Sequence, residues 1–255
     1  MKSKNASIVR FAISWGCTAL LGAAAYVVFH LRESYAPVKE KPHSSKPVIT
    51  AMGDSITFGA GVAKTRKTDA WVYLLEKLLE GKYQVLNYGI SGATLQDEGN
   101  FPYWNMKQKM LQGFPEAALA LNPEIVILML GTNDSKPYNW NAQRYEKELY
   151  ARVQEILAHA SVKRLILMCP PFATGKDDGG IVPFDIQNEI IRDYIVPAVK
   201  KCAAETGVEC IDLYALTEGH KEYLEDGVHP NREGNKIIAE CIQRHICRCC
   251  KEYDK

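Results

Sequence analysis

The chain lacks a strong net charge, internal repeats and any signature of nucleic-acid binding. Its 255 residues carry a formal net charge of +1, and the basic residues are scattered, so no surface of one sign is expected to attract an anionic polymer. Hydrophobic residues make up 47% and charged residues 24%, which is ordinary for a globular protein. The length and composition therefore predict a single α/β domain without a nucleic-acid partner.

A dense cysteine pattern is also absent. Eight cysteines are present, but their spacing fits neither a small disulfide scaffold nor a zinc site. Three of them, Cys247, Cys249 and Cys250, cluster near the end of the chain. We expect free or disulfide-linked thiols there, and we predict no metal.

The glycine-rich stretches do not match cofactor-binding fingerprints. Gly59-Ala60-Gly61 lacks the third glycine of a dinucleotide site, and the phosphate-loop pattern that ends in Gly-Lys-Ser/Thr is missing. The run from Gly53 to Thr57 lacks the second glycine of the α/β-hydrolase nucleophile turn. We therefore predict no cofactor, and a serine at this turn would belong to another class of enzyme.

The amino terminus differs from the rest of the chain. Lys2, Lys4 and Arg10 precede a stretch from Phe11 to Phe29 that holds no charged residue. Two interpretations stay open: an uncleaved membrane anchor, or a signal peptide cleaved near 23–25. The apolar run continues past that cleavage site, which favours the anchor. Both interpretations place the domain outside the cytoplasm, either membrane-anchored or secreted or periplasmic.

The composition divides the chain into four parts. Residues 1–30 form the predicted anchor or signal peptide, and residues 31–46 a linker rich in Lys, Pro and Ser. Residues 47–246 form the predicted folded domain, and residues 247–255 a cysteine-rich tail.

Short apolar runs alternate with helical patterns along the folded part. The runs predict buried strands at 48–52, 83–87, 124–130, 164–169 and 209–212. Periodicity and cap residues predict helices at 70–79, 142–159, 185–205 and 231–245, the third broken or bent at Pro197. This alternation predicts a parallel five-stranded sheet with helices on both faces, whose ligands bind beyond the carboxyl ends of the strands.

Chemically useful residues follow these strands. Ser55 follows the first strand, Gly92 the second and Asn133 the third, and His229 lies beyond the fifth. A serine needs a base to become a nucleophile, and Asp226, three residues before His229, can fix the tautomer of that imidazole. The backbone N–H groups of Ser55 and Gly92 and the amide of Asn133 can donate to an oxyanion. The pattern predicts a Ser55–His229–Asp226 triad for acyl transfer.

The ordered blocks also resemble a known family. Gly53-Asp54-Ser55, Gly92, Gly131-Thr132-Asn133-Asp134 and Asp226-Gly227-Val228-His229-Pro230 are similar to the blocks of the SGNH, or GDSL-type, hydrolases. The resemblance spans residues 48 to about 246, although the first block continues with Ile rather than Leu. It implies a flavodoxin-like three-layer α/β/α fold, serine esterase activity, no metal, and the same roles for the site residues. The stretch 131–140 is similar to members that remove acetyl groups from sugars.

These observations lead to one expected function and two alternatives. We expect a serine esterase that hydrolyses O-acyl esters, in particular O-acetyl esters of carbohydrate, through an acyl-enzyme intermediate. Asp54 and Trp140 are predicted to contact the substrate, Trp140 by packing its face against a sugar ring. The alternatives are a lysophospholipase or thioesterase, and a non-catalytic glycan-binding protein on the same fold. The expected partners are a small-molecule or glycan ester and, through the amino-terminal segment, a membrane. The acyl group, the alcohol and the oligomeric state stay open.

Overall fold

The computed structural model describes residues 37–175 and 183–253, with side chains of the last helix described as far as Arg248. The predicted anchor or signal peptide therefore lies outside the described residues. Within the described ranges, no helix has both the length and the apolar character needed to cross a bilayer.

Five parallel strands form the central sheet, in the order β2-β1-β3-β4-β5. They are β1 (Val48–Gly53), β2 (Gln84–Gly89), β3 (Ile125–Met129), β4 (Arg164–Cys169) and β5 (Glu209–Asp212). Every residue of β1, β2 and β3 is buried, which explains the largely apolar runs of β1 and β3, whereas β2 also buries the polar side chains of Gln84 and Asn87. The predicted five-stranded parallel sheet is confirmed, and its strand order is that of the flavodoxin-like fold.

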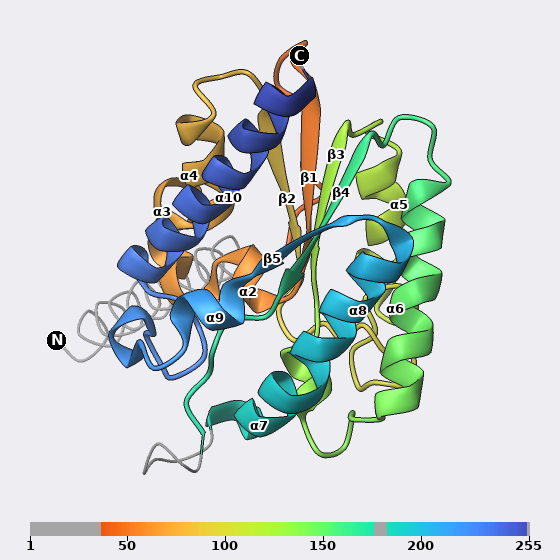
Figure 1. The fold of residues 1–255 in the computed structure, drawn as a ribbon, viewed down its shortest axis with the longest axis vertical. Coiled ribbons are helices and arrows are strands. Elements are labelled where there is room, and N and C mark those ends of the chain that lie inside the picture. Colours follow the sequence, from red (N-terminus) through yellow and green to blue (C-terminus); the bar gives the residue numbers. More distant parts are fainter. Residues whose placement is uncertain (1–36, 176–182, 254–255) are drawn as a thin grey trace, which may run out of the picture. The chain divides into compact units, whose positions relative to one another are not determined.

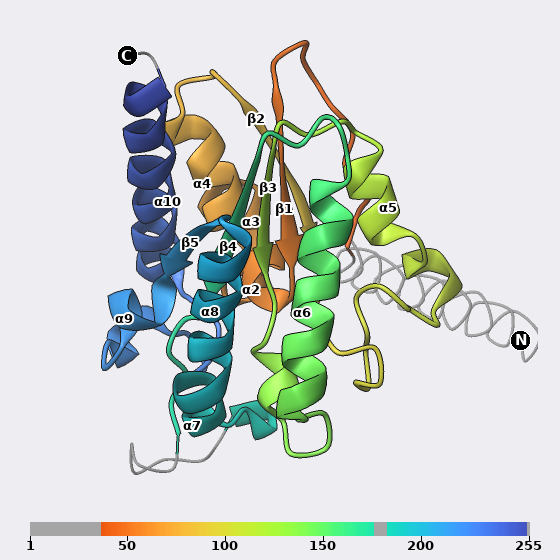
Figure 2. The ribbon, with the colours of Figure 1, turned by 45° about the vertical axis from the view of Figure 1, so that its right-hand side comes forward.

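Helices cover both faces of the sheet and give three layers (Figure 1). One face carries α3 (Arg66–Asp69), α4 (Trp71–Leu78) and α10 (Arg232–Tyr253), and the other carries α5 (Phe114–Leu119), α6 (Ala142–Leu157) and α8 (Val196–Thr206). Figure 2 shows the two sets separated by the sheet. The short helices α2 (Ser55–Phe58), α7 (Asn188–Ile190) and α9 (Leu213–Thr217) lie near the carboxyl ends of the strands.

Each face of the sheet has its own apolar core. Successive residues of a strand point to opposite faces, so Ile127 and Leu128 of β3 belong to different cores. Ile127 shares its core with Trp71 of α4 and Ile242 of α10, whereas Leu128 shares its core with Tyr145 of α6. The two cores hold the strands, and therefore the loops that follow them, in a fixed arrangement.

Several helical segments differ from the sequence-based expectation. The predicted break at Pro197 is wrong: the irregularity is a π-helical stretch, Ile191–Ile195, that precedes this proline. Pro197 instead lies in the first turn of α8, where a missing N–H is harmless. Helix α5 was not predicted, and neither were the short helices α2, α3 and α9. Helix α10 continues past the predicted end at His245 to Tyr253, and so includes most of the predicted tail.

The predicted linker belongs in part to the folded unit, which begins at Pro37 rather than near Pro47. The Glu40 carboxylate accepts hydrogen bonds from the N–H of Asn87 at 2.7 Å and from the Tyr73 hydroxyl at 2.5 Å. The Glu76 carboxylate accepts from the N–H of Val85 at 2.7 Å. Because β2 is an edge strand, these carboxylates occupy N–H groups that would otherwise be free to pair with another strand.

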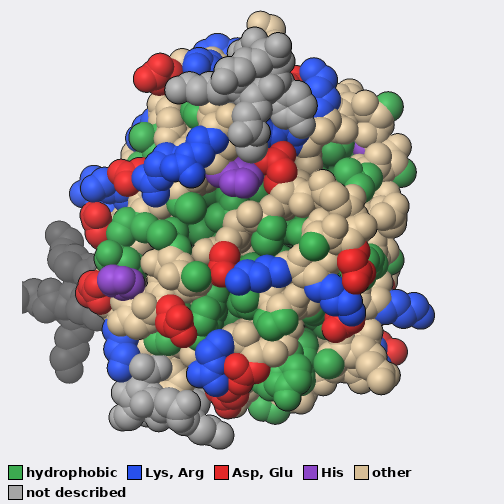
Figure 3. Space-filling view, in the orientation of Figure 1, with side chains coloured by type: hydrophobic (Ala, Val, Ile, Leu, Met, Phe, Trp, Pro, Cys, Tyr) green, Lys and Arg blue, Asp and Glu red, His purple; other side chains and the backbone are tan. Residues whose placement is uncertain are grey.

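Charges of both signs are mixed on the surface of the domain. On the face drawn in Figure 3, Lys and Arg side chains alternate with Asp and Glu, and no extended area of one sign appears there. This face therefore offers no basic surface for a polyanion.

Candidate active site

Ser55 is the first residue of α2 and is separated from the end of β1 by Asp54 alone, a position set by tight local packing. The carboxylate of Asp54 caps the helix by accepting the N–H of Ile56 at 2.9 Å. Gly53 leaves no room for a side chain, because a Cβ atom would lie 2.6 Å from the carbonyl oxygen of Met129. Gly59 ends the helix with φ of 92°. The turn therefore holds Ser55 rigidly at the end of a central strand.

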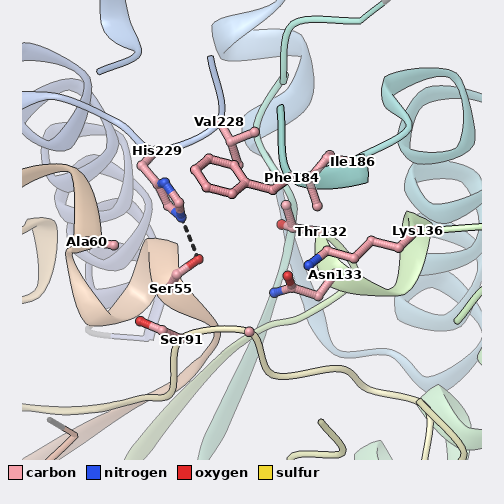
Figure 4. Close-up of a pocket in the computed structure, with 11 residues that line it drawn as sticks. Ser55, Ala60, Ser91, Thr132, Asn133, Lys136, Phe184, Ile186, Val228 and His229 are labelled. Atoms are coloured by element: carbon pink, nitrogen blue, oxygen red, sulfur yellow. Dashed lines mark hydrogen bonds between the residues drawn. The ribbon is translucent and has the colours of Figure 1, made fainter. Parts of the chain in front are cut away.

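Ser55, His229 and Asp226 form a continuous hydrogen-bonded chain. Ser55 Oγ lies 2.8 Å from His229 Nε2, and His229 Nδ1 lies 2.7 Å from Asp226 Oδ2 (Figure 4 shows the first of these contacts). With Nδ1 donating to the carboxylate, Nε2 is left to accept the serine proton. The predicted triad residues are thus brought together, at distances suited to proton transfer.

The carboxylate of Asp226 is itself held in place. Its Oδ1 accepts the N–H groups of Val228 at 3.1 Å and His229 at 2.9 Å. Partial burial acts to raise the pKa of Asp226, but the hydrogen bonds from His229 outweigh it, and the pKa lies below its usual value. Asp226 is therefore ionised at neutral pH and can orient the imidazole.

The loop that carries His229 is fixed to both α4 and α10. The buried side chain of Asn235 donates to the carbonyl of Pro230 at 2.7 Å and accepts the N–H of Trp71 at 2.9 Å. Gly61 permits this approach, since a Cβ atom there would lie 2.2 Å from the carbonyl oxygen of Pro230. These contacts therefore fix the loop that carries His229 relative to α4 and α10.

The predicted oxyanion donors lie in the same cavity as Ser55 and His229. Gly92 has φ of 84°, a conformation that favours glycine, and a side chain at that position would meet no atom within 4 Å. Asn133 uses one amide hydrogen to donate to the carbonyl of Ala93 at 3.2 Å, which leaves the other hydrogen for a ligand. The cavity measures about 180 Å³, and its remaining lining residues are Ala60, Ser91, Thr132, Lys136, Phe184, Ile186 and Val228.

The strand order explains why these groups meet. Ser55 follows β1 and Asn133 follows β3, the neighbouring strands at which the direction of chain winding reverses. Doubly wound sheets open a crevice at this point, between loops that lead to opposite faces. The sequence order of the motifs thus places the serine and the amide donor on two sides of one crevice.

Asp134 connects two of the loops that form the cavity. Its carboxylate is fully buried and accepts the N–H groups of Leu95 and Gln96, both at 2.9 Å. Burial raises the pKa of Asp134 to about 6, although these N–H groups act in the opposite direction. Asp134 thereby ties the loop that carries Gly92 to the loop that carries Asn133. The sequence motif contained Asp134, but its position alone did not reveal this role.

Two residues predicted to contact the substrate lie outside the cavity lining. Asp54 is completely buried, and burial raises its pKa to about 6 against the effect of the Ile56 N–H. Its hydrogen bond is that of a helix cap, and contact of Asp54 with the substrate stays a prediction. Trp140 packs against Tyr145 and Tyr194, with ring centroids 5.7 and 6.0 Å away. Contact of Trp140 with a sugar likewise stays a prediction.

Phe184 was missed by sequence reasoning, although it lines the cavity. A single phenylalanine in a polar loop has no spacing that separates it from a packing residue, so no sequence signal was available.

Among residues 37–175 and 183–248, no group of three or more His, Cys, Asp and Glu side chains is arranged to hold a metal ion.

Comparisons with known proteins give one family and a common fold. Residues 51–237 match the GDSL-like Lipase/Acylhydrolase family. An acetylxylan esterase of Xylanibacter ruminicola is 33% identical over 218 residues, which cover 78% of this chain and 42% of that protein. The chain therefore spans less than half the length of this relative.

Two solved structures align with most of the chain. A carbohydrate acetylesterase from Sinorhizobium meliloti gives a TM-score of 0.62 at 21% identity, over 80% of this chain and 100% of its own. A variant of an acetyl-xylooligosaccharide esterase from Geobacillus gives a TM-score of 0.57 at 25% identity, over 80% of this chain and 95% of its own. Both share the fold described above.

Proposed function

The chain belongs to the GDSL-like lipase/acylhydrolase family, and from that premise we propose that it is a serine esterase that removes O-acetyl groups from carbohydrate. The proposal rests chiefly on one observation, the hydrogen-bonded chain from Asp226 through His229 to Ser55. The Ser55 end of this series of hydrogen bonds lies in the cavity that Gly92 and Asn133 also line. Acyl transfer to a serine requires a hydroxyl that is hydrogen-bonded to an oriented imidazole, with amide donors beside it for the oxyanion.

In the first half of the proposed reaction, the enzyme is acylated. His229 Nε2 takes the proton of Ser55 Oγ as that oxygen attacks the carbonyl carbon of the ester. The negative charge that develops on the carbonyl oxygen is stabilised by the N–H groups of Ser55 and Gly92 and by the amide of Asn133. Asp226 stabilises the imidazolium. The bond to the alcohol then breaks, and His229 gives its proton to the departing alcohol oxygen.

The second half releases the acid. Water enters the place that the alcohol has left, and His229 Nε2 takes a proton from it. The resulting hydroxide attacks the carbonyl carbon of the acyl-enzyme, and the same three donors stabilise the oxyanion. When the bond to Ser55 Oγ breaks, the serine oxygen recovers its proton from His229. One acetate leaves in each cycle, and the enzyme returns to its starting state.

The size of the cavity and the relatives support acetyl esters of carbohydrate. A volume of about 180 Å³ suits a short acyl group better than a fatty chain, which needs a long apolar groove. Lys136 and Ser91 add polar groups to the lining. The acetylxylan esterase and the acetyl-xylooligosaccharide esterase that resemble this chain act, by their names, on acetylated xylan or its fragments.

We place the activity outside the cytoplasm. The basic residues followed by the uncharged stretch from Phe11 to Phe29 support membrane anchoring or export. Acetylated polysaccharides are too large to cross a bilayer, so an enzyme that acts on them must meet them outside. Fractionation of cells that express the full chain tests this placement, and recovery of the protein only in the cytoplasm would contradict it.

The test of the activity compares three esters and one variant. The parent protein should release acetate from acetylated xylooligosaccharides and cleave p-nitrophenyl acetate much faster than p-nitrophenyl octanoate. Ser55→Ala should abolish all three reactions while keeping the parent circular dichroism spectrum. Faster cleavage of the octanoate would favour a lipid hydrolase, and a folded parent that cleaves none of the esters would refute the esterase.

A further inference from the structure

We propose that Phe184 and Lys136 form two sides of a subsite for the alcohol part of the ester, and that this alcohol is a sugar. The inference rests on the proposed function and adds to it the residues that select the substrate. Phe184 comes from the turn before α7, and Lys136 comes from the loop that also carries Asn133. Figure 4 shows both side chains reaching into the cavity in front of Ser55.

The reaction itself indicates which part of the substrate Phe184 faces. Its ring lies 5.4 Å from the imidazole of His229, measured between centroids, with the planes inclined at 63°. His229 gives its proton to the leaving oxygen, so that oxygen must lie within hydrogen-bonding distance of Nε2. The carbonyl oxygen points instead toward Gly92 and Asn133. A ring packed against His229 therefore borders the alcohol.

Phe184 is held in this position at an energetic cost. Its side chain is 55% exposed, which is unusual for a phenylalanine, and its φ is 55°. The next residue, Asp185, has φ of 60°, so two successive non-glycine residues occupy the left-handed region. This conformation is unfavourable for residues other than glycine and persists where the surroundings impose it.

The surroundings of the turn do impose this conformation. The N–H of Gln187 donates to Ser135 Oγ at 3.1 Å, and Ser135 Oγ donates to the carbonyl of Thr132 at 2.8 Å. The N–H of Ile186 donates to the carbonyl of Pro183 at 3.0 Å. The turn is thus attached to the block that carries Asn133. An exposed aromatic ring fixed to the oxyanion loop has the rigidity of a binding platform.

Lys136 supplies the polar side of the same subsite. Its side chain runs along the cavity in Figure 4, and the ammonium points toward Asn133. Desolvation lowers the pKa of Lys136, while the carboxylates of Asp185 and Asp54 act to raise it. An ammonium has three donors and no acceptor, so a half-buried lysine is stabilised by a ligand that offers several oxygens.

A sugar fits this pair of residues better than a lipid does. A pyranose ring has an apolar face of C–H groups, which can pack on the ring of Phe184, and a rim of hydroxyl oxygens, which can accept from Lys136. A fatty alcohol would cover the ammonium without pairing it, and burying an unpaired charge is unfavourable. The two side chains together therefore select a hydroxyl-rich alcohol.

The test varies the alcohol and keeps the acyl group constant. Acetylated xylooligosaccharides and methyl acetate give the same acetyl-enzyme, so a difference in kcat/KM between them reports on the alcohol. Phe184→Ala should lower kcat/KM for the sugar ester roughly tenfold, the upper range of a single aromatic contact, and lower it much less for methyl acetate. Phe184→Tyr should restore the sugar reaction. Lys136→Met should also affect the sugar ester more than methyl acetate.

The control is an exposed aromatic residue away from the cavity. Tyr194 is 53% exposed and packs against Trp140, so Tyr194→Ala should leave both reactions at the parent rate. Equal losses for both esters in Phe184→Ala would show that the ring acts only by orienting His229, and no loss for either would remove it from the site. Both results would overturn the subsite. A parent protein that hydrolyses neither ester would instead refute the proposed esterase.

Discussion

At the scale of residues, we predict that the side chains of Ser55, His229 and Asp226 act as one unit. Ser55→Ala and His229→Ala should each lower kcat for p-nitrophenyl acetate by a factor on the order of 10⁴ to 10⁶. The kcat of the double variant should be little lower than that of either single variant, because the serine and the histidine each depend on the other for activity. Losses that multiply in the double variant would mean that the two residues act independently.

Asn133 should contribute to the transition state more than to substrate binding. Asn133→Ala removes the amide donor from the cavity, and loss of one such donor typically lowers kcat by about 10² to 10³ while KM changes little. A change confined to KM would instead assign Asn133 to ground-state binding. Asn141→Ala is the matched control: this residue caps α6 by accepting the N–H of Arg144. It should lower stability by about 1 kcal/mol and leave kcat unchanged.

The sequence predicted that Ser55, Asn133 and His229 meet at one cavity, but it did not reveal that Asp54 and Trp140 lie outside the cavity lining. Ser55, Asn133 and His229 could be placed together because each follows a strand, and parallel strands end at one edge. The side-chain direction of Asp54 and Trp140 depends on packing: Asp54 turns inward to cap α2, and Trp140 turns toward Tyr145. Proximity in sequence to a motif was therefore a poor guide to contact with the cavity.

At the scale of elements, burial decided how much could be predicted. The buried strands β1, β3 and β4 are largely apolar runs, which made them easy to find from the sequence. The more polar β2 and the short, partly buried β5 were found as well. Helix α5 has six residues and follows a long irregular stretch, which leaves too little periodicity to detect. The π-helical stretch from Ile191 to Ile195 carries no local sequence signal, and Pro197 misleadingly suggested a break two residues later.

A cluster of charges connects β4, β5 and α10 and should make stability depend on pH. Glu209 lies 2.7 Å from Arg164 and 2.8 Å from His245. Partial burial acts to raise the pKa of Glu209, but the bonds to Arg164 and His245 dominate and lower it to about 2 from 4.5. Because the folded pKa is depressed, the stabilisation is complete above pH 4.5 and is lost as the pH falls toward 2.

Urea unfolding at several pH values tests this cluster. Glu209→Gln should lower the free energy of unfolding at pH 7 by about 2 to 3 kcal/mol, and the difference from the parent should shrink as the pH falls through 4 toward 2. Glu146→Gln is the control, because the contact of Glu146 with Lys201 is exposed to solvent. This substitution should leave the urea concentration at the midpoint of unfolding unchanged. If the difference in unfolding free energy between the parent and Glu209→Gln stayed constant from pH 7 to 3, the depressed pKa of Glu209 would not be the source of the stability.

At the scale of the whole molecule, the described domain extends further toward the amino terminus than the composition suggested. The segment 37–46 is polar and lacks regular structure, so its sequence resembles a linker. Its contacts are long-range hydrogen bonds, which composition cannot reveal. Glu40 reaches both the edge strand and α4 through Asn87 and Tyr73, and Lys39 Nζ donates to the carbonyl of Gln112 at 2.6 Å.

Two shortened chains test the importance of this segment. A chain that starts at Pro37 should unfold at the same urea concentration as one that keeps the earlier residues. A chain that starts at Pro47 loses the Glu40 contacts and should be less stable by on the order of 2 kcal/mol, since hydrogen bonds to charged groups contribute about 1.5 to 3 kcal/mol. Glu40→Ala in the longer chain should reproduce most of that loss. Equal stability of the two shortened chains would show that the segment only lies on the surface.

The separation of Ser55 and His229 along the chain also has a consequence in time. Ser55 Oγ and His229 Nε2 share one hydrogen bond, although the two residues lie 174 positions apart in the sequence. During synthesis or export the nucleophile emerges early, whereas its base emerges only shortly before α10 begins. A partly made chain therefore has a serine hydroxyl but nothing to deprotonate it. In the proposed mechanism, hydrolysis can start only after the chain has been made as far as His229 and the loop that carries it has packed against α4 and α10, so the order of the motifs itself delays the chemistry.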